Sequence, residues 1–303
     1  MEVIQENEDK KILVVTNTKK TAYLLADWLL GKGVELRLLT TLIIPYHRKK
    51  IIHVFKSDPK PNVLISTQLI EAGVDLSVDI IYRFFAPLDS IIQAAGRTNR
   101  SYENVATKGV VHLIDMEYGN GQKDYNSVYL RNSYRSDGDL RMANTFKLLS
   151  KNAVCEEKEM FQLGKEYFAS IHNPNYWLAT YKMLRNHNLK DFGDRTRIIV
   201  QDQPTRSVIV LAGSWASEVE VLLDEREALL SNLFDESQNS FTAKAQLREN
   251  MRKISPYMLS VTEAEAKKLT EYPGDDCFTF PIRTQYDELL GLKIYEEITA
   301  MSL

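Results

Sequence analysis

The chain has 303 residues, enough for about two domains, and its formal net charge is −3. Cys155 and Cys277 lie far apart without a CxxC pattern or a histidine-rich neighbourhood, which argues against a disulfide framework and a metal site and favours a cytoplasmic setting. No apolar run approaches the ~20 residues that a membrane span needs, so we expect no membrane partner. Residues 1–110 carry 15 basic and 12 acidic side chains, against 23 and 29 in the remainder, which excludes a strongly basic nucleic-acid coat.

Short apolar runs alternate with helical patterns over the first 116 residues. The patterns predict strands at 11–16, 34–39, 62–67, 78–85 and 109–115, and helices at 21–33, 45–55 and 88–97. Strands rich in Val, Ile and Leu that alternate with helices indicate a parallel sheet covered on both faces. We therefore predict an α/β domain over residues 1–116.

The remainder of the chain reads as a connection followed by a smaller α+β region. Residues 117–141 are rich in Gly, Asn, Ser, Asp and Tyr, which predicts an irregular segment. Helices are expected near 139–151, 156–170, 175–190, 216–232 and 241–253, a β-hairpin with a turn at Pro204 over 196–211, and short strands at 255–261, 277–282 and 291–295. We expect a helical linker region over 117–195 and a C-terminal domain over 196–303.

The junction between the first strand and the first helix lacks the usual phosphate-binding loop. It reads "VVTNTKKTAYLL", without GxxxxGK[ST] or GxGxxG, and no acidic DExD/H strand end follows. The chain thus lacks the lysine and hydroxyl that hold phosphates and magnesium in such sites. We expect any nucleoside-triphosphate site to be completed by another domain.

Polar residues nevertheless gather where ligands of parallel sheets bind. In "LISTQLIEAGVDL", Ser66 and Thr67 end a strand, while Gly73 and Asp75 follow in a turn. If Asp89 or Ser90 caps the next helix, one polar stripe carries Gln93, Arg97 and Arg100. Guanidinium groups suit phosphate oxygens, because their planar fork binds two at once.

The stretch "LISTQLIEAGVDLSVDIIYRFFAPLDSIIQAAGRTNR" resembles motifs V and VI of superfamily 2 helicases. It is most similar to the CRISPR-associated helicase–nuclease of type I CRISPR–Cas systems, and the downstream "RIIVQDQPTRSVIVL" and "YDELLGL" resemble that family's C-terminal region. The resemblance implies a second RecA-like domain of the P-loop NTPase type, followed by a C-terminal accessory domain. The family's HD nuclease, Walker A and DExD/H elements do not occur in this sequence.

The same resemblance implies an activity and partners. The complete protein would be an ATP-dependent DNA helicase with a nuclease, which unwinds and degrades invading DNA during CRISPR interference. Its cofactor would be ATP, with Mg²⁺ held by the first RecA-like domain. Its partners would be single-stranded DNA, the RNA-guided surveillance complex, and the first RecA-like and HD nuclease domains of the same protein or of a separate subunit. This chain alone would be inactive.

The helicase motifs also imply site residues. Arg97 and Arg100 would reach the γ-phosphate across the cleft, with Gln93 helping to sense it, and an arginine in that role is worth roughly 10³–10⁵ in rate. Their alternative is a solvated basic helix face paired with Asp89 or Glu103. Gly73 and Asp75 would complete the nucleotide site, with an ordinary loop turn as the alternative.

Four further residues would touch DNA. Ser66 and Thr67 would offer a hydroxyl and a backbone N–H to a phosphate, or simply be satisfied at a strand end. Thr18 lies at the position of helicase motif IV, and it is also a good helix N-cap. Arg48 stands in the basic first turns of the 45–55 helix, which suggests an anionic partner, although a solvated face explains it as well.

Two other function classes remain open. The chain could be a non-catalytic docking module that recruits a protein or nucleic-acid partner through its C-terminal region. It could also be a fragment of another superfamily 2 helicase that acts on RNA. Binding of single-stranded DNA, and ATPase activity with and without an added first RecA-like domain, discriminate between these readings.

Overall fold

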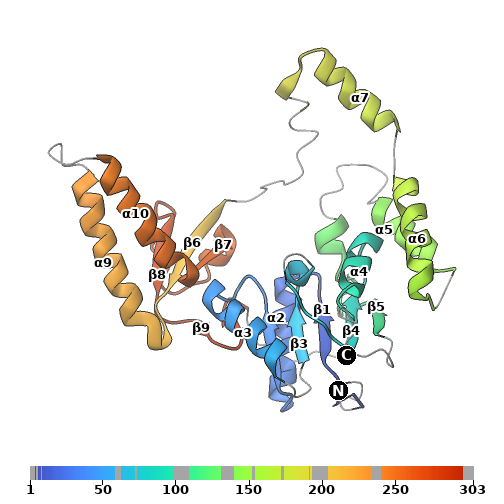
Figure 1. Cartoon of the computed structure of the whole chain (residues 1–303), viewed down its shortest axis with the longest axis horizontal. Helices are drawn as coiled ribbons and strands as arrows, with labels where there is room; N and C mark the ends of the chain where they lie inside the picture. Colours follow the sequence, from blue (N-terminus) through green and yellow to red (C-terminus); the bar gives the residue numbers. More distant parts are fainter. Residues whose placement is uncertain are drawn as a thin grey trace.

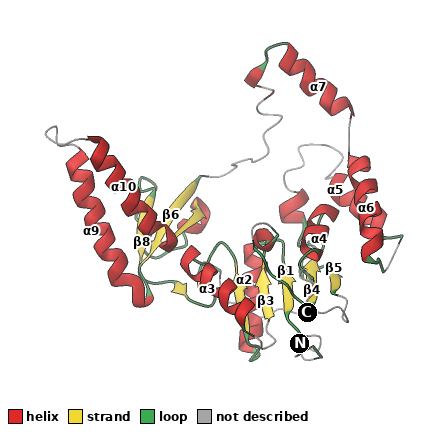
Figure 2. Ribbon diagram, viewed as in Figure 1, coloured by secondary structure: helices red, strands yellow, loops and turns green. Residues whose placement is uncertain are grey.

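The computed structural model holds a parallel sheet and a smaller mixed sheet, both flanked by helices (Figures 1 and 2). It describes residues 4, 6–7, 9–58, 63–71, 74–98, 109–130, 140–151, 154–171, 174–190, 192, 204–233 and 240–295. Among them, no helix is both long and apolar enough to span a bilayer.

The first sheet contains five parallel strands in the order β2-β3-β1-β4-β5. The strands are β1 (Ile12–Val15), β2 (Leu36–Leu39), β3 (Val63–Ser66), β4 (Ile80–Phe84) and β5 (Val110–Ile114). The first four are buried on both sides, as their continuous apolar runs predict, whereas β5 is a partly exposed edge. The predicted α/β fold is confirmed.

Helices cover both faces of this sheet. Thr18 caps α2 (Lys19–Gly31), since its hydroxyl accepts a hydrogen bond from the Thr21 N–H at 2.9 Å, and α3 (Pro45–Ser57) begins at a proline. Ala22, Ala26 and Leu29 of α2 pack against one face together with β1 residue Ile12. Phe55 of α3 packs with Leu13 and Leu64 on the other face.

Helix α4 (Leu88–Ala95) packs against α5 (Leu140–Leu149) and α6 (Glu157–Ile171). Neither Asp89 nor Ser90 caps α4, which corrects the expected helix start: Pro87 is the N-cap, and the Leu88 N–H donates to the Thr145 hydroxyl at 2.9 Å. Asp89 instead accepts a hydrogen bond from the Tyr167 hydroxyl at 2.9 Å. The start of α4 is therefore fixed by residues far along the chain. A further helix, α7, spans Pro174–Arg185.

The C-terminal region is built on the three-stranded sheet β7-β6-β8. Its elements are β6 (Thr205–Val210), α9 (Ala216–Leu233), α10 (Ser240–Ile254), β7 (Met258–Thr262), α11 (Glu263–Ala266) and β8 (Thr279–Ile282), followed by the short pair β9 (Tyr286–Asp287) and β10 (Gly291–Leu292). The predicted hairpin over 196–211 is corrected, because β6 pairs antiparallel with β7 and parallel with β8. The first run of that hairpin lies outside the described residues.

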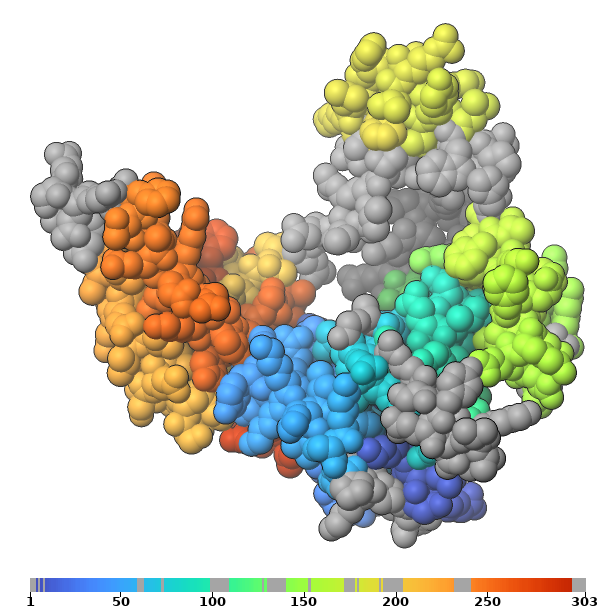
Figure 3. Space-filling model, viewed as in Figure 1, coloured from blue at the N-terminus to red at the C-terminus, as the bar shows by residue number. Residues whose placement is uncertain are grey.

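The two sheets share one apolar core. Leu42, Ile43 and Ile44, which follow β2, are fully buried in the cluster that also contains Val208 and Leu292. The Leu292 N–H donates to the Leu42 carbonyl at 2.9 Å, which fixes β10 against the loop after β2. The contact between the C-terminal region and α3 is continuous in the space-filling view (Figure 3). The division into 1–116, 117–195 and 196–303 remains a prediction about folding units.

Candidate functional site

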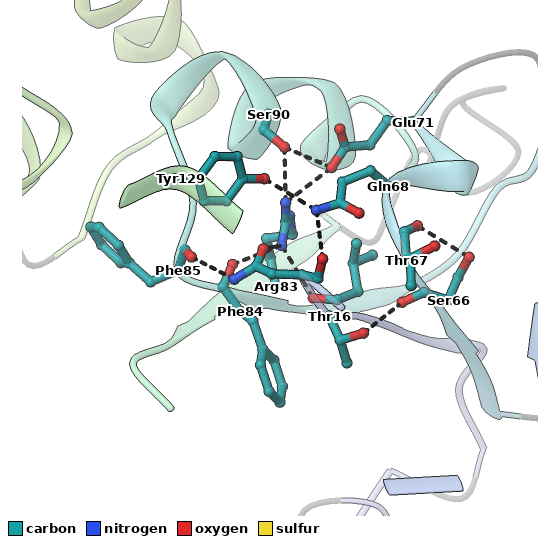
Figure 4. A network of polar contacts seen from close by, with 12 residues as sticks. Thr16, Ser66, Thr67, Gln68, Glu71, Arg83, Phe84, Phe85, Ser90 and Tyr129 are labelled. Atoms are coloured by element: carbon teal, nitrogen blue, oxygen red, sulfur yellow. Dashed lines mark hydrogen bonds and ion pairs between the residues drawn. The ribbon is translucent and has the colours of Figure 1, made fainter. Parts of the chain in front are cut away.

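Polar residues converge at the carboxyl edge of the parallel sheet. Thr16 and Asn17 follow β1, Thr67 follows β3, and Phe85 follows β4. Beyond β1 the chain moves towards β2, whereas beyond β4 it moves towards β5, so β1 and β4 flank the point where the connections diverge. Open α/β sheets bind ligands at such points. The edge is therefore the candidate site, and Figure 4 shows its polar contacts.

Arg83 lies at the centre of this site and is fully buried. Its Nη1 donates to the Asn17 side-chain oxygen at 2.7 Å and to the Phe84 carbonyl at 2.9 Å. Its Nη2 donates to the Ser90 hydroxyl at 2.8 Å and to the Glu71 carboxylate at 3.1 Å (Figure 4). One guanidinium thus joins the end of β1, the segment after β3 and the start of α4.

Glu71 forms a buried ion pair with Arg83. The Ser90 hydroxyl also donates to Glu71 Oε1 at 2.7 Å, so the carboxylate is held from two directions. Burial raises the pKa of Glu71, and the Arg83 guanidinium and Ser90 hydroxyl offset part of that rise. Removing one partner from such a pair leaves a buried charge and costs about 3–5 kcal/mol, whereas the intact pair adds little net stability. The pair therefore fixes the relative positions of Glu71 and Arg83 but adds little to the stability of the fold.

Arg97 lies at the other end of α4 from Ser90. Its Nη2 donates to the Glu71 carbonyl at 2.7 Å, and its own carbonyl accepts from the Val78 N–H at 3.0 Å. The side chain is buried, with 9% of the residue exposed. The structure therefore places Arg97 against the predicted motif V segment, through the backbone of Glu71.

The predicted stripe of Gln93, Arg97 and Arg100 on one helix face is wrong. Helix α4 ends at Ala95 with Gly96 as its C-cap, and the Arg97 N–H bonds to the Ala94 carbonyl three residues back. Gln93 is exposed on the helix, whereas Arg97 follows it in a turn and is buried. Arg100 lies outside the described residues. Of the two acids named as alternative partners of Arg97, Asp89 bonds to Tyr167, and Glu103 lies outside the described residues.

Of the two residues expected to complete the nucleotide site, Gly73 lies outside the described residues. Asp75 is exposed, and its carboxylate forms an ion pair with Lys56 of α3 at 3.2 Å. Both groups are largely open to solvent, where such a pair contributes about 0–1 kcal/mol. A role for Asp75 in nucleotide binding therefore stays a prediction.

The predicted DNA contacts divide into buried and accessible groups. Ser66 is fully buried, and its hydroxyl donates to the Leu39 carbonyl at 2.8 Å and to the Thr67 carbonyl at 3.2 Å (Figure 4). This corrects the expectation of a Ser66 hydroxyl that meets a phosphate. Thr67 is buried with 6% of the residue exposed. Thr18 is half-buried, and its hydroxyl is the α2 cap described above.

Arg48 lies where α3 meets the C-terminal region. It is half-buried, and among the described residues its Nε finds no hydrogen-bond partner although that atom is buried. Burial lowers the pKa of Arg48, and Tyr286 opposes the shift. The neighbouring His47 is buried, with its Nδ1 3.0 Å from the Tyr286 hydroxyl, and burial lowers its pKa against the opposing effect of Glu288. Arg48 thus lies at the contact between α3 and the C-terminal region, and its role in DNA binding stays a prediction.

Residues after β5 lie across the candidate site. The Asp124 carboxylate accepts hydrogen bonds from the Asn17 N–H at 3.3 Å, the Thr21 hydroxyl at 2.6 Å and the Tyr118 hydroxyl at 2.6 Å. Burial and Asp124 together raise the pKa of Tyr118 to about 12. Asp124 therefore occupies the amino end of α2, the kind of place where helices bind anions.

Sequence reasoning missed most members of this network, namely Asn17, Glu71, Arg83 and Asp124. One signal was available: Arg83 is the only charged residue in "IIYRFF", which belongs to a run predicted to be a buried strand. A buried arginine needs several acceptors, so its presence there indicates a polar cluster. No group of three or more His, Cys, Asp or Glu that could hold a metal ion occurs in the described part of the chain.

Part of the sequence is similar to known proteins. Residues 8–103 match the family described as CRISPR-associated nuclease/helicase Cas3, C-terminal. The CRISPR-associated nuclease/helicase Cas3 of Haloferax volcanii is 47% identical over 76 residues, which are 24% of this chain and 8% of that protein. The DEAD-box ATP-dependent RNA helicase CshB of Bacillus subtilis is 32% identical over 106 residues, 34% of this chain and 24% of that protein.

Solved structures share the fold over most of the chain. The crystal structure of T. fusca Cas3-ATP matches with a TM-score of 0.56 at 16% identity, over 93% of this chain and 37% of that one. A chain of the CRISPR RNA-guided surveillance complex, pre-nicking, matches with a TM-score of 0.56 at 16% identity, over 96% and 42%. The chain thus spans less than half the length of each of these four proteins.

Proposed function

Because residues 8–103 carry the sequence of the Cas3 C-terminal family and the chain has the fold of Cas3 over most of its length, we propose that it is the ATP-coupling, DNA-contacting half of a CRISPR helicase–nuclease. The observation that carries the proposal is the position of Arg97. This motif VI arginine lies within the matched segment and contacts the backbone of Glu71 in motif V. The complete protein unwinds and degrades invading DNA, and this chain alone is catalytically incomplete.

This chain supplies only part of the groups that an ATP site needs. Arg97 supplies a guanidinium, Gln93 an exposed amide and Asp75 an exposed carboxylate, whereas the phosphate-binding loop and the magnesium ligands belong to the first RecA-like domain. ATP, when bound, would supply a triphosphate whose transferred phosphoryl group needs cationic side chains beside it. For Arg97 to reach that triphosphate, its guanidinium would have to leave the Glu71 carbonyl.

Single-stranded DNA lies, in this proposal, along the carboxyl edge of the sheet. Thr18 and the backbone of Thr67 belong to that edge, and Arg48 stands at the start of α3, where Lys49 and Lys50 are exposed. Such contacts bind the phosphate backbone without reading sequence. The partner that delivers the strand is an RNA-guided surveillance complex, as suggested by the similarity to a chain of such a complex.

The first test is the substitution Arg100→Ala in the complete protein, or in this chain combined with its first RecA-like domain. We expect the ATPase rate to fall by about 10³-fold or more, because an arginine that stabilises the transferred phosphoryl group is lost. Arg252→Ala is the matched control, since Arg252 is an exposed arginine of α10 paired with Glu249. Normal ATPase in the Arg100 variant, with a wild-type rate in the control, refutes the assigned role.

Similarity to CshB favours a second candidate, an RNA helicase fragment. Fluorescence anisotropy of this chain with oligo-dT and oligo-U of equal length separates the two, and the proposal requires binding to oligo-dT that is at least as tight as to oligo-U. Binding to oligo-U alone favours the RNA reading. Absence of binding to both favours a docking module.

A further inference from the structure

We infer that Arg83 is a positioning residue that couples the proposed DNA-contacting turn to the proposed ATP-sensing arginine. The coupling runs through the buried connection, defined here as Asn17, Arg83, Glu71 and Arg97. The inference rests on the proposed function for the roles of its two ends. The contacts between its members are independent of that function.

The first step joins the turn after β1 to Arg83. Asn17 is almost fully buried and lies beside Thr18, so a phosphate that contacts this turn also bears on Asn17. Its side-chain oxygen accepts from Arg83 Nη1 at 2.7 Å, and its amide donates to the Phe85 carbonyl at 2.9 Å. Gln68 Nε2 donates to the Asn17 carbonyl at 3.0 Å. Movement of this turn therefore also displaces the Arg83 side chain.

The second step joins Arg83 to Glu71. The guanidinium and the Ser90 hydroxyl both bond to Glu71 Oε1, at 3.1 and 2.7 Å. Arg83 is fully buried and the Glu71 side chain is only 9% exposed, so a bond that breaks here is poorly compensated by water. A shift of Arg83 must then carry Glu71 or Ser90 with it.

The third step joins Glu71 to Arg97 through the main chain. The Glu71 carbonyl accepts from Arg97 Nη2 at 2.7 Å, in the same residue whose side chain is held by Arg83. The buried connection thus passes from the side chain of Glu71 to its backbone and on to the arginine at the far end of α4. Arg97 lies seven positions after Ser90, beyond the end of α4 at Ala95.

A purely structural role does not account for the choice of residues. Arg83 stands in a central strand where a branched apolar side chain satisfies the packing, and replacing buried ion pairs by such residues is often neutral or stabilising. Among the described residues, the buried Nε of Arg83 finds no hydrogen-bond partner, so the cluster is not even fully satisfied. A coupling element is expected to join two ligand sites without contributing much stability. The buried connection has this character, since it joins two proposed ligand sites.

The test is a double-mutant cycle on the stimulation of ATPase by single-stranded DNA. Asn17→Ala, Glu71→Gln and the double variant are made in the complete protein, or in this chain combined with its first RecA-like domain. Glu71→Gln keeps the backbone carbonyl that holds Arg97 and removes only the charge that pairs with Arg83. The quantity measured is the ratio of ATPase rates with and without oligo-dT.

We expect each single variant to lower this ratio by about 5-fold or more, the lower end of typical coupling. The double variant is expected to show no larger loss than the greater of the two single losses, since both interrupt the same connection. Losses that multiply in the double variant, or a ratio unchanged by Glu71→Gln, overturn the inference while leaving the proposed function intact. Absence of DNA stimulation in the wild type overturns both.

Two controls separate coupling from damage to the fold. Glu263→Gln removes the acidic partner of Arg206, another buried arginine, in the C-terminal region, and it is expected to leave the ratio unchanged alone and to act independently of Asn17→Ala. Hydrogen exchange of this chain alone, with and without oligo-dT, reports on residues 88–98. Protection there is expected to change on DNA binding in the wild type and not in Glu71→Gln. An equal change in both overturns the inference.

Discussion

Arg83 shows how one charged side chain can organise the edge of a sheet. It brings together the ends of two strands and the start of a helix, although the strand that carries it is otherwise apolar. The sequence places Arg83 within a predicted strand but does not show which acceptors surround it, because Asn17 and Glu71 are separated from it by 66 and 12 positions. Nothing in their local patterns distinguishes them from ordinary turn residues.

At this scale the structure predicts the effect of removing the arginine. Arg83→Met leaves Glu71 buried without its ion-pair partner, so the free energy of unfolding is expected to fall by about 3–5 kcal/mol at neutral pH. The double variant Arg83→Met with Glu71→Met is expected to recover most of that loss, because the buried charge is gone. Urea unfolding monitored by circular dichroism measures both. A double variant less stable than Arg83→Met contradicts this account.

The loss of unfolding free energy caused by Arg83→Met also depends on pH. Burial already raises the pKa of Glu71 above its ordinary value of 4.5, and removal of Arg83 takes away an opposing effect, so the pKa rises further. A carboxyl whose pKa is raised by folding disfavours the folded state once it ionises there. The deficit is therefore greatest above the folded pKa and shrinks as the pH falls towards 4.5. Unfolding curves at stepwise lower pH check this, and a deficit that grows on acidification contradicts it.

Among the elements, α4 illustrates where sequence patterns succeed and fail. Its existence was predicted from "LDSIIQAAGR", but the expected stripe continued through Arg97 and Arg100, whereas the helix stops at Ala95. Gly96 is a poor helix former, and the last turn tightens with three-residue bonds that redirect Arg97 inwards. The strands of the first sheet were predicted correctly because short runs rich in Val, Ile and Leu alternate there with helical patterns. The β6 pairing was not, because distant strands β7 and β8 take both its edges.

The short pair β9 and β10 supplies an element-scale prediction through Gly291. Its φ is +78°, and a Cβ there would lie 2.5 Å from the Leu42 carbonyl oxygen. Gly291→Ala is expected to lower the free energy of unfolding by about 2–4 kcal/mol, from backbone strain and overpacking together. Gly121→Ala is the matched control, with φ of +77° and open space around the added carbon, so it is expected to lose only about 1 kcal/mol. Equal losses in urea unfolding contradict the packing argument.

For the whole molecule, the shared core sets how the two sheets unfold. The sequence predicted a smaller α+β region but not that its strands would join the core beneath α2, because that contact depends on surface shape rather than on local pattern. The Lys19 ammonium of α2 also pairs with Glu265 at 2.7 Å. Burial raises the pKa of Glu265, but the bonds from Lys19 and Thr262 outweigh that effect and leave the pKa lowered.

This arrangement predicts cooperative unfolding. Amides of β1 and of β6 are expected to lose protection from hydrogen exchange at the same denaturant concentration, because opening one sheet exposes the apolar surface of the other. Exchange measured by mass spectrometry across a guanidinium series provides the comparison. Helix α7 is the control segment, with exposed apolar residues such as Tyr181, and it is expected to exchange earlier. Separate transitions for β1 and β6 favour independent domains with the predicted boundaries.

The bond between Leu292 and Leu42 has a consequence during protein synthesis. Leu42, Ile43 and Ile44 leave the ribosome well before the strand that covers them, which is 250 residues further along the chain. At about 5–20 residues per second, this apolar triplet waits for roughly 10–50 s before its partner emerges. During that interval a newly made chain exposes apolar surface that favours aggregation. The yield of folded protein in the cell is therefore expected to depend on translation speed and on chaperones that bind this surface.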